Sequence, residues 1–180
     1  QLCLMTAQLA NGGFKIYPKI IADKNDKTAD EIKALINKDS KNSNSKEDSH
    51  NFLKPSTKDS HEKLFSNPEN IKLVKEAMFA STNEVRGTSY SSRIEDPKYQ
   101  FAGKTGTSQV KRISKRDREL NLKTLEIPYN DRDHALYIAF GPYKNPRYSL
   151  SILVEHGGSG SSAAAPIAKK LFKLIIDRHE

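Results

Sequence analysis

Residues 134–155 read HALYIAFGPYKNPRYSLSILVE, and this stretch decides the fold class. Two runs rich in β-branched and aromatic residues, 134–140 and 148–155, flank a segment with the glycine, prolines and asparagine typical of a turn. This pattern predicts two antiparallel strands joined as a hairpin through residues 141–147.

A third strand is predicted over residues 101–110, FAGKTGTSQV, although its centre offers little that could pack in a core. Side chains alternate between the faces of a strand, so the hydroxyls of Thr105 and Thr107 share one face and Lys104 points to the other. Gly106 has no Cβ, which lets a substrate backbone lie directly against the strand. On an edge strand, free amides can pair with an extended peptide, and the Thr107 amide can face a developing oxyanion. The segment suits a peptide that ends in a carboxylate.

Three helices are expected around these strands. Residues 1–11 have a helical repeat that ends at Gly12 and Gly13. Asn67 is a predicted cap for a helix that begins at Pro68. This helix runs to about Asn83 with a buried stripe of Ile71, Val74, Ala77, Met78 and Ser81. A final helix begins at about Ser162 and has an apolar face of Ile167, Ala168, Leu171, Phe172 and Ile175.

The order of these elements predicts an α+β fold, with an antiparallel sheet flanked by helices. Residues 14–22 are extended in character, and Pro18 favours an edge position. Residues 23–66 are predicted to be a polar flexible insertion, with a short helix possible over 30–36. Residues 111–132 have no sustained period and are predicted to be a basic loop.

Composition limits the function classes. The 180 residues suffice for one domain, carry a net charge of +8, and contain no apolar run long enough to span a bilayer. The single Cys3 excludes an internal disulfide. Residues 104–118 hold six Lys or Arg against one Asp, without interleaved aromatic residues. This run favours a solvated loop over a nucleic-acid contact.

Beyond the Lys-Thr-Gly triplet, which matches one signature of the penicillin-recognising serine enzymes, the chain resembles the transpeptidase domain of class B penicillin-binding proteins. The resemblance is greatest to the penicillin-binding protein 2 subfamily of cell-elongation enzymes. The matching stretches are residues 2–13, which end in MTAQLANGG and match loosely at Leu2-Cys3-Leu4, EVRGTSY at 84–90, AGKTGTSQV at 102–110, HALYIAFGPYKNPRYSLSILVEHGGSGSS at 134–162 and AAAPIAKKLF at 163–172. We therefore expect residues 1–180 to be a C-terminal fragment of this domain, the C-terminal portion of the penicillin-binding and serine β-lactamase-like fold.

The resemblance implies an acyl-transfer reaction at the bacterial cell wall. A serine attacks the D-Ala-D-Ala end of a peptidoglycan stem peptide, and the amine of a neighbouring stem peptide then takes the acyl group. By this resemblance Lys104 belongs to the proton and charge network, while Thr105, Gly106 and Thr107 bind substrate. No cofactor is expected, and no metal site is indicated, because the five histidines are scattered without a Cys or carboxylate partner at ligand spacing. The implied partners are stem peptides, β-lactams, a membrane peptidoglycan polymerase and elongation-complex proteins, at the periplasmic face of the inner membrane and without nucleic acid.

The family's serine motif S-x-x-K and its S-x-N motif are expected to lie upstream of Gln1. Residues 43–46 and 60–63 fit S-x-x-K literally, and residues 40–42 and 81–83 fit S-x-N. A working serine must begin a buried helix so that its lysine is desolvated enough to act as a base. The first three matches lie in a polar tract, and residues 81–83 end a helix. We expect the isolated chain to be inactive.

Other functions remain open from the residues alone. A β-lactamase or carboxypeptidase differs from a transpeptidase in deacylation by water, whose machinery is not visible in this sequence. A non-catalytic, penicillin-sensing module would keep the same binding wall. A basic nucleic-acid module acting through residues 111–118 would bind DNA with a steep dependence on salt.

Overall fold

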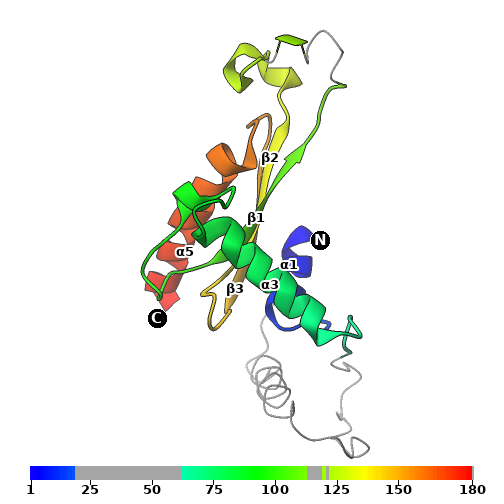
Figure 1. Ribbon diagram of the computed structural model, residues 1–180, viewed down its shortest axis with the longest axis vertical. Helices are drawn as coiled ribbons and strands as arrows, with labels where there is room; N and C mark the ends of the chain where they lie inside the picture. The colour runs from blue at the N-terminus through cyan, green and yellow to red at the C-terminus, as the bar shows by residue number, and fades with distance from the viewer. Residues whose placement is uncertain (19–61, 113–118, 121, 180) are drawn as a thin grey trace, which may run out of the picture.

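The computed structural model describes residues 1–18, 62–112, 119–120 and 122–179. Its centre is an antiparallel sheet of three strands in the order β1-β2-β3, with β1 at Ala102–Ser108, β2 at His134–Gly141 and β3 at Tyr148–Val154. The predicted hairpin and the predicted third strand are both confirmed (Figure 1).

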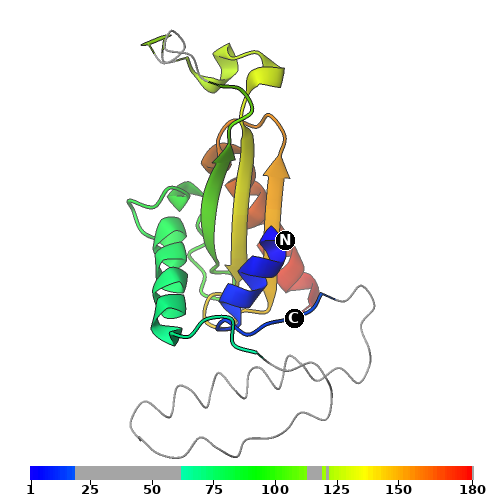
Figure 2. The ribbon, with the colours of Figure 1, turned by 90° about the vertical axis from the view of Figure 1, so that its right-hand side faces the viewer.

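After His134 the central strand β2 carries only apolar or aromatic side chains, because helices cover both faces of the sheet. Ala135, Tyr137 and Ala139 pack in a core beneath the C-terminal helix α5, Ala165–His179. Phe140 faces the opposite core, which includes Ala10 of the first helix α1, Leu2–Ala10. Figure 2 shows α1 in front of the sheet and α5 behind it, which confirms the α+β prediction.

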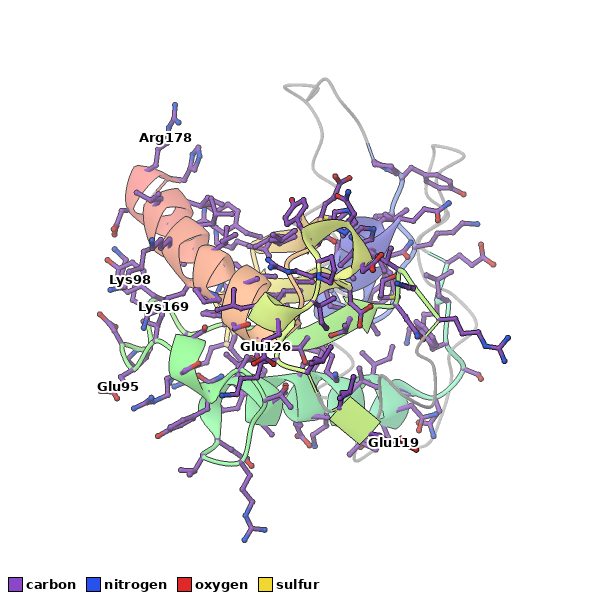
Figure 3. The ribbon with its side chains drawn as sticks, turned by 90° about the horizontal axis from the view of Figure 1, so that it is seen from above. Glu95, Lys98, Glu119, Glu126, Lys169 and Arg178 are labelled. Atoms are coloured by element: carbon purple, nitrogen blue, oxygen red, sulfur yellow. The ribbon has the colours of Figure 1, made fainter. Side chains whose placement is uncertain are left out.

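The third helix, α3 at Pro68–Asn83, begins where the sequence predicts. The Asn67 side chain accepts a hydrogen bond from the Glu69 amide at 2.9 Å. The helix lies beside β1 rather than over the hairpin, and seen along the strands α1, α3 and α5 surround the sheet (Figures 2 and 3). Its last turn therefore reaches the edge of β1.

The predicted buried stripe of α3 is partly wrong. Ile71 and Met78 are buried, but Val74 and Ala77 are exposed. Thr82, which the apolar pattern omitted, is fully buried. The helix is rotated so that a hydroxyl, and not a further apolar side chain, meets the sheet at its C-terminal end.

The apolar face of α5 is also rotated from the prediction. Ala168 and Phe172 are buried as expected, whereas Ile167 and Leu171 are 40% and 36% exposed. The remaining buried positions of the helix are Ala165 and Ile176. The apolar face of α5 is wide enough that either of its two sides could be buried. The sheet contacts the side that carries the small residues.

The segments outside these elements differ from the predictions or lie outside the described residues. Of residues 14–22, positions 14–18 form only an isolated bridge between Phe14 and Lys63, and the rest are not described. The predicted insertion and its short helix fall almost wholly outside the described residues. The described part of the 111–132 loop carries two 3₁₀ turns, Thr124–Glu126 and Tyr129–Asp131, beyond the ends of β1 and β2 (Figure 1). No described helix has the length and apolarity needed to cross a membrane.

A π-helical turn, Gly160–Ala164, leads from the hairpin into α5 and packs on β1 and β2. Gly160 is buried against the backbone of these strands. A Cβ built on it would lie 2.3 Å from the Leu136 carbonyl oxygen and 2.6 Å from that of Gly106. Only glycine fits there, because the opposing atoms belong to paired backbone.

We predict that Gly160→Ala lowers the free energy of unfolding by about 1–3 kcal/mol, since β1 and β2 must move to admit a methyl group. Urea titration followed by circular dichroism measures the change. Gly106→Ala is the milder comparison, because its new Cβ would meet Leu136 Cβ at 3.3 Å, which a shift of a few tenths of an ångström relieves, so its loss of stability should be smaller. A Gly160→Ala protein as stable as the wild type would contradict this packing.

Candidate active site

Helix α3 covers the outer edge of β1 at the start of the strand. Gly103 N–H donates to the Thr82 Oγ1 at 3.0 Å, and Asn83 Nδ2 donates to the Phe101 carbonyl at 2.9 Å. In an antiparallel strand, alternate residues point both backbone groups to the same side. The backbone groups of residues 101, 103, 105 and 107 therefore point away from β2.

Thr105 and Thr107 present the part of this edge that α3 does not cover. Thr105 is half-buried and Thr107 is exposed, so neither is sealed in a core. The Thr105 carbonyl accepts a hydrogen bond from Lys104 Nζ at 2.9 Å. The Thr105 and Thr107 amides face outward. Among the described residues, the edge is thus open at the amides of the two threonines, while the exposed Lys104 side chain holds the Thr105 carbonyl.

Lys104 lies on the opposite face of β1 from the two threonines, as strand alternation predicts. Its neighbour Ala102 belongs to the core shared with α1 and α3, whereas Tyr137, the partner of Thr105, belongs to the core beneath α5. The Lys104 side chain is exposed and reaches a surface hollow beside α3, where Arg86 supplies a second cation. The hollow is lined by Ala77, Ala80, Ser81, Glu84, Arg86, Gly87, Thr88 and Lys104.

A chain of three hydroxyls connects this edge to α3. The Thr88 Oγ1 lies 3.2 Å from the Thr105 Oγ1 and 3.2 Å from the Ser81 Oγ. If Thr88 donates to Thr105, the Thr105 hydrogen is free to donate outward, and each bond in such a chain strengthens the next. With the hydrogens in that direction, the chain leaves Thr105 as a donor toward an anion.

A buried hydroxyl cluster fixes α3 against the sheet. The Tyr137 Oη lies 2.9 Å from the Thr82 Oγ1 and 3.0 Å from the Ser89 Oγ. Ser89 also donates to the Ser81 carbonyl at 3.0 Å. Burial raises the pKa of Tyr137 above its usual value, which keeps the phenol protonated. The position of the open edge relative to α3 depends on this cluster.

His156 shapes the turn after β3. It has a φ of 53°, its amide donates to His134 Nδ1 at 2.9 Å, and its own Nδ1 lies 3.0 Å from the Arg132 carbonyl oxygen. Among the described residues, no group of three or more His, Cys, Asp or Glu side chains could hold a metal ion.

Of the literal matches to S-x-x-K and S-x-N, the structure fully describes residues 81–83. Residues 40–46 and Ser60 lie outside the described residues. In the triplet 81–83, Ser81 joins the hydroxyl chain, while Thr82 and Asn83 cap the edge of β1. These three side chains hold backbone and hydroxyl groups in place, and none is set beside a lysine at the start of a buried helix.

Sequence reasoning did not identify four residues that shape the site: Thr82, Asn83, Thr88 and Tyr137. Thr88 stands in the EVRGTSY stretch, which carried a family resemblance but no assigned chemistry. The other three act through contacts between α3 and the sheet, which no local pattern shows. Of the basic run, Lys111 forms an ion pair with Asp131 at 2.7 Å, and residues 113–118 lie outside the described residues.

The fold is that of a penicillin-binding protein transpeptidase domain. The family model described as the penicillin binding protein transpeptidase domain matches residues 1–173, and the chain belongs to this family.

Among curated proteins, the chain is 41% identical over 105 residues to the peptidoglycan D,D-transpeptidase MrdA of Salmonella typhimurium, covering 58% of this chain and 16% of that protein. The MrdA of Haemophilus influenzae is 32% identical over 104 residues, covering 58% and 15%. Among solved structures, the complex between penicillin-binding protein PBP2 and MreC from Helicobacter pylori aligns with a TM-score of 0.50 and 28% identity, over 62% of this chain and 18% of that one. The alignments span less than a fifth of each relative's length.

We predict that Tyr137→Phe lowers the free energy of unfolding by about 1–3 kcal/mol, because Thr82 and Ser89 lose a buried hydrogen-bond partner. Thermal and urea unfolding measure the loss. Tyr148→Phe is the control, since the hydroxyl of that half-buried tyrosine makes no hydrogen bond among the described residues and the change should stay within about 0.5 kcal/mol. Equal stabilities of the two variants would contradict the role of the cluster.

Proposed function

We propose that the chain is part of a peptidoglycan D,D-transpeptidase and forms the wall of its active site that holds the carboxylate end of a stem peptide. The observation that carries the proposal is the open edge of β1 at Thr105 and Thr107, with the Lys104 ammonium beside it. Outward amides can pair with an extended peptide, hydroxyls can donate to its carboxylate, and the cation adds a favourable field. Family membership and the names of the relatives support the same reaction.

The proposed reaction is acyl transfer through a serine ester. The serine oxygen attacks the carbonyl of the penultimate D-Ala and gives up its proton, and the peptide C–N bond breaks. The terminal D-Ala leaves with that proton on its amine. The amino group of a second stem peptide then attacks the ester, forms the cross-link, and returns a proton to the serine. A β-lactam enters the first step in place of D-Ala-D-Ala.

In this reaction the residues of β1 bind the substrate and polarise its carbonyl group, and none of them is the nucleophile. Thr105 and Thr107 hold the substrate carboxylate, and the Thr107 amide faces the oxygen of the tetrahedral intermediate. Lys104 belongs to the charge and proton network around the serine. We assign the serine to a part of the protein outside these 180 residues, because both literal S-x-x-K matches lie in a polar tract of the sequence, which does not favour the buried helix that a nucleophilic serine needs.

The proposal extends to location and partners. Peptidoglycan cross-linking takes place outside the cytoplasmic membrane, so we place the whole protein at the periplasmic face of the inner membrane. The solved complex of a similar protein with MreC supports an elongation-complex partner of that kind. A membrane peptidoglycan polymerase is a further proposed partner.

The binding wall is tested with N-acetyl-D-Ala-D-Ala and its C-terminal amide, titrated into the chain and followed by nuclear magnetic resonance. We predict that the wild-type chain binds the free acid more tightly than the amide. In Thr107→Val the affinity for the acid should fall about tenfold or more, because a hydrogen bond to a charged group is removed, whereas the affinity for the amide should not change. Thr107→Ser keeps the hydroxyl and should keep the preference. Equal binding of acid and amide by the wild-type chain would overturn the proposed function.

The location of the nucleophile is tested with a fluorescent penicillin. We predict that denaturing electrophoresis shows no covalent adduct on the isolated chain, because the nucleophilic serine is assigned to a part of the protein outside it. A penicillin-binding protein that carries its serine motif is the positive control for the reagent. An adduct on this chain would show that one of its own serines is competent and would refute the assignment.

A further inference from the structure

The last turn of α3 closes one end of the peptide slot on β1. At Gly103 the Thr82 Oγ1 accepts from the amide at 3.0 Å and donates to the carbonyl at 3.4 Å. At Phe101 the carbonyl is taken by Asn83 Nδ2. An added strand would need these same backbone groups for its own ladder. The amides of Thr105 and Thr107 are therefore available for pairing, and the Thr105 carbonyl is held only by the exposed Lys104 side chain, whereas the edge before them is blocked.

The block combines the buried hydroxyl of Thr82 with the half-buried side-chain amide of Asn83, and both are hydrogen-bonded. Thr82 is 0% exposed, and its hydroxyl also contacts the Met78 carbonyl and the Tyr137 hydroxyl. Asn83 Nδ2 makes a second bond, to the Phe79 carbonyl at 3.1 Å. A peptide that displaced these side chains would leave buried polar groups without partners, which is more costly than the pairing it would gain. The end of the slot is therefore fixed.

We propose that Thr82 and Asn83 act as an end-stop, so that the slot accepts a peptide only if its chain terminates beside Thr105. This inference rests on the proposed function, in which β1 pairs with an extended peptide. The two threonines supply an interaction for the terminus, whereas the end-stop excludes any chain that continues past it. Thr82 and Asn83 are then specificity-determining residues without contact to the reacting atoms.

The charges at the end-stop select which terminus lies there. The hollow next to Thr105 holds the ammonium of Lys104 and the guanidinium of Arg86 against the single carboxylate of Glu84. A carboxyl terminus is attracted to this field and an amino terminus is repelled. The peptide therefore runs antiparallel to β1, with its carboxyl end at Thr105 and its preceding residue beside Thr107.

The test separates the end-stop from recognition of charge by using neutral peptides only. Acetylated D-Ala-D-Ala peptides are capped with an amide, a methylamide, a glycinamide and a diglycinamide, and their binding to the full 180-residue chain is titrated by nuclear magnetic resonance. A matched series is extended by the same glycines at the amino end. We expect the glycinamide and diglycinamide caps to bind about tenfold or more weakly than the simple amide. The amino-terminal extensions should change affinity less than about twofold.

The outcomes distinguish this inference from the function on which it rests. Glycinamide and diglycinamide caps that bind as well as the simple amide would overturn the end-stop, even where the free acid binds best. A wild-type chain that binds acid and amide equally but still rejects the longer caps would support the end-stop and overturn the carboxylate wall. Equal losses from amino-terminal and carboxyl-terminal extension would overturn the end-stop, because a blocked edge excludes chain at one end only.

Discussion

The hydroxyl of Thr82 is the contact on which the arrangement of the site depends. It is fully buried and bonds to groups from three elements: the Gly103 amide of β1, the Tyr137 hydroxyl of β2 and the Met78 carbonyl of its own helix. A buried hydroxyl that satisfies several partners fixes their relative positions more narrowly than apolar packing does. Through it, α3 is held against the edge of β1 rather than over a face of the sheet.

This contact divides the edge of β1 into two parts with different uses. At residues 101–103 the outward backbone groups are hydrogen-bonded to side chains of α3, which protects this part of the edge from pairing with other chains. The part at residues 105–107 keeps its outward amides and gains a neighbouring ammonium and a chain of hydroxyls. A short open edge beside a cationic hollow suits the end of a peptide better than its middle. The proposed substrate follows from that geometry and from the family to which the chain belongs.

The sequence predicted the elements well and their orientation less well. The hairpin, the strand at 101–110 and the Asn67 cap depend on local patterns, and each is confirmed. The buried faces of α3 and α5 were misjudged because each helix has a wide apolar face and tertiary packing chose one side of it. Thr82 could not be found from hydrophobic periodicity, since its burial depends on partners from two strands. The substrate roles of Lys104, Thr105, Gly106 and Thr107 stay predictions.

Residue-resolved amide hydrogen exchange on the chain without ligand tests the central claim most directly. If α3 caps β1 at Gly103 and leaves Thr105 and Thr107 open, the Gly103 amide exchanges at least about a hundredfold more slowly than the other two, after correction for intrinsic rates. Comparable rates at the three amides, whether all slow or all fast, would contradict an edge that is closed in one half and open in the other.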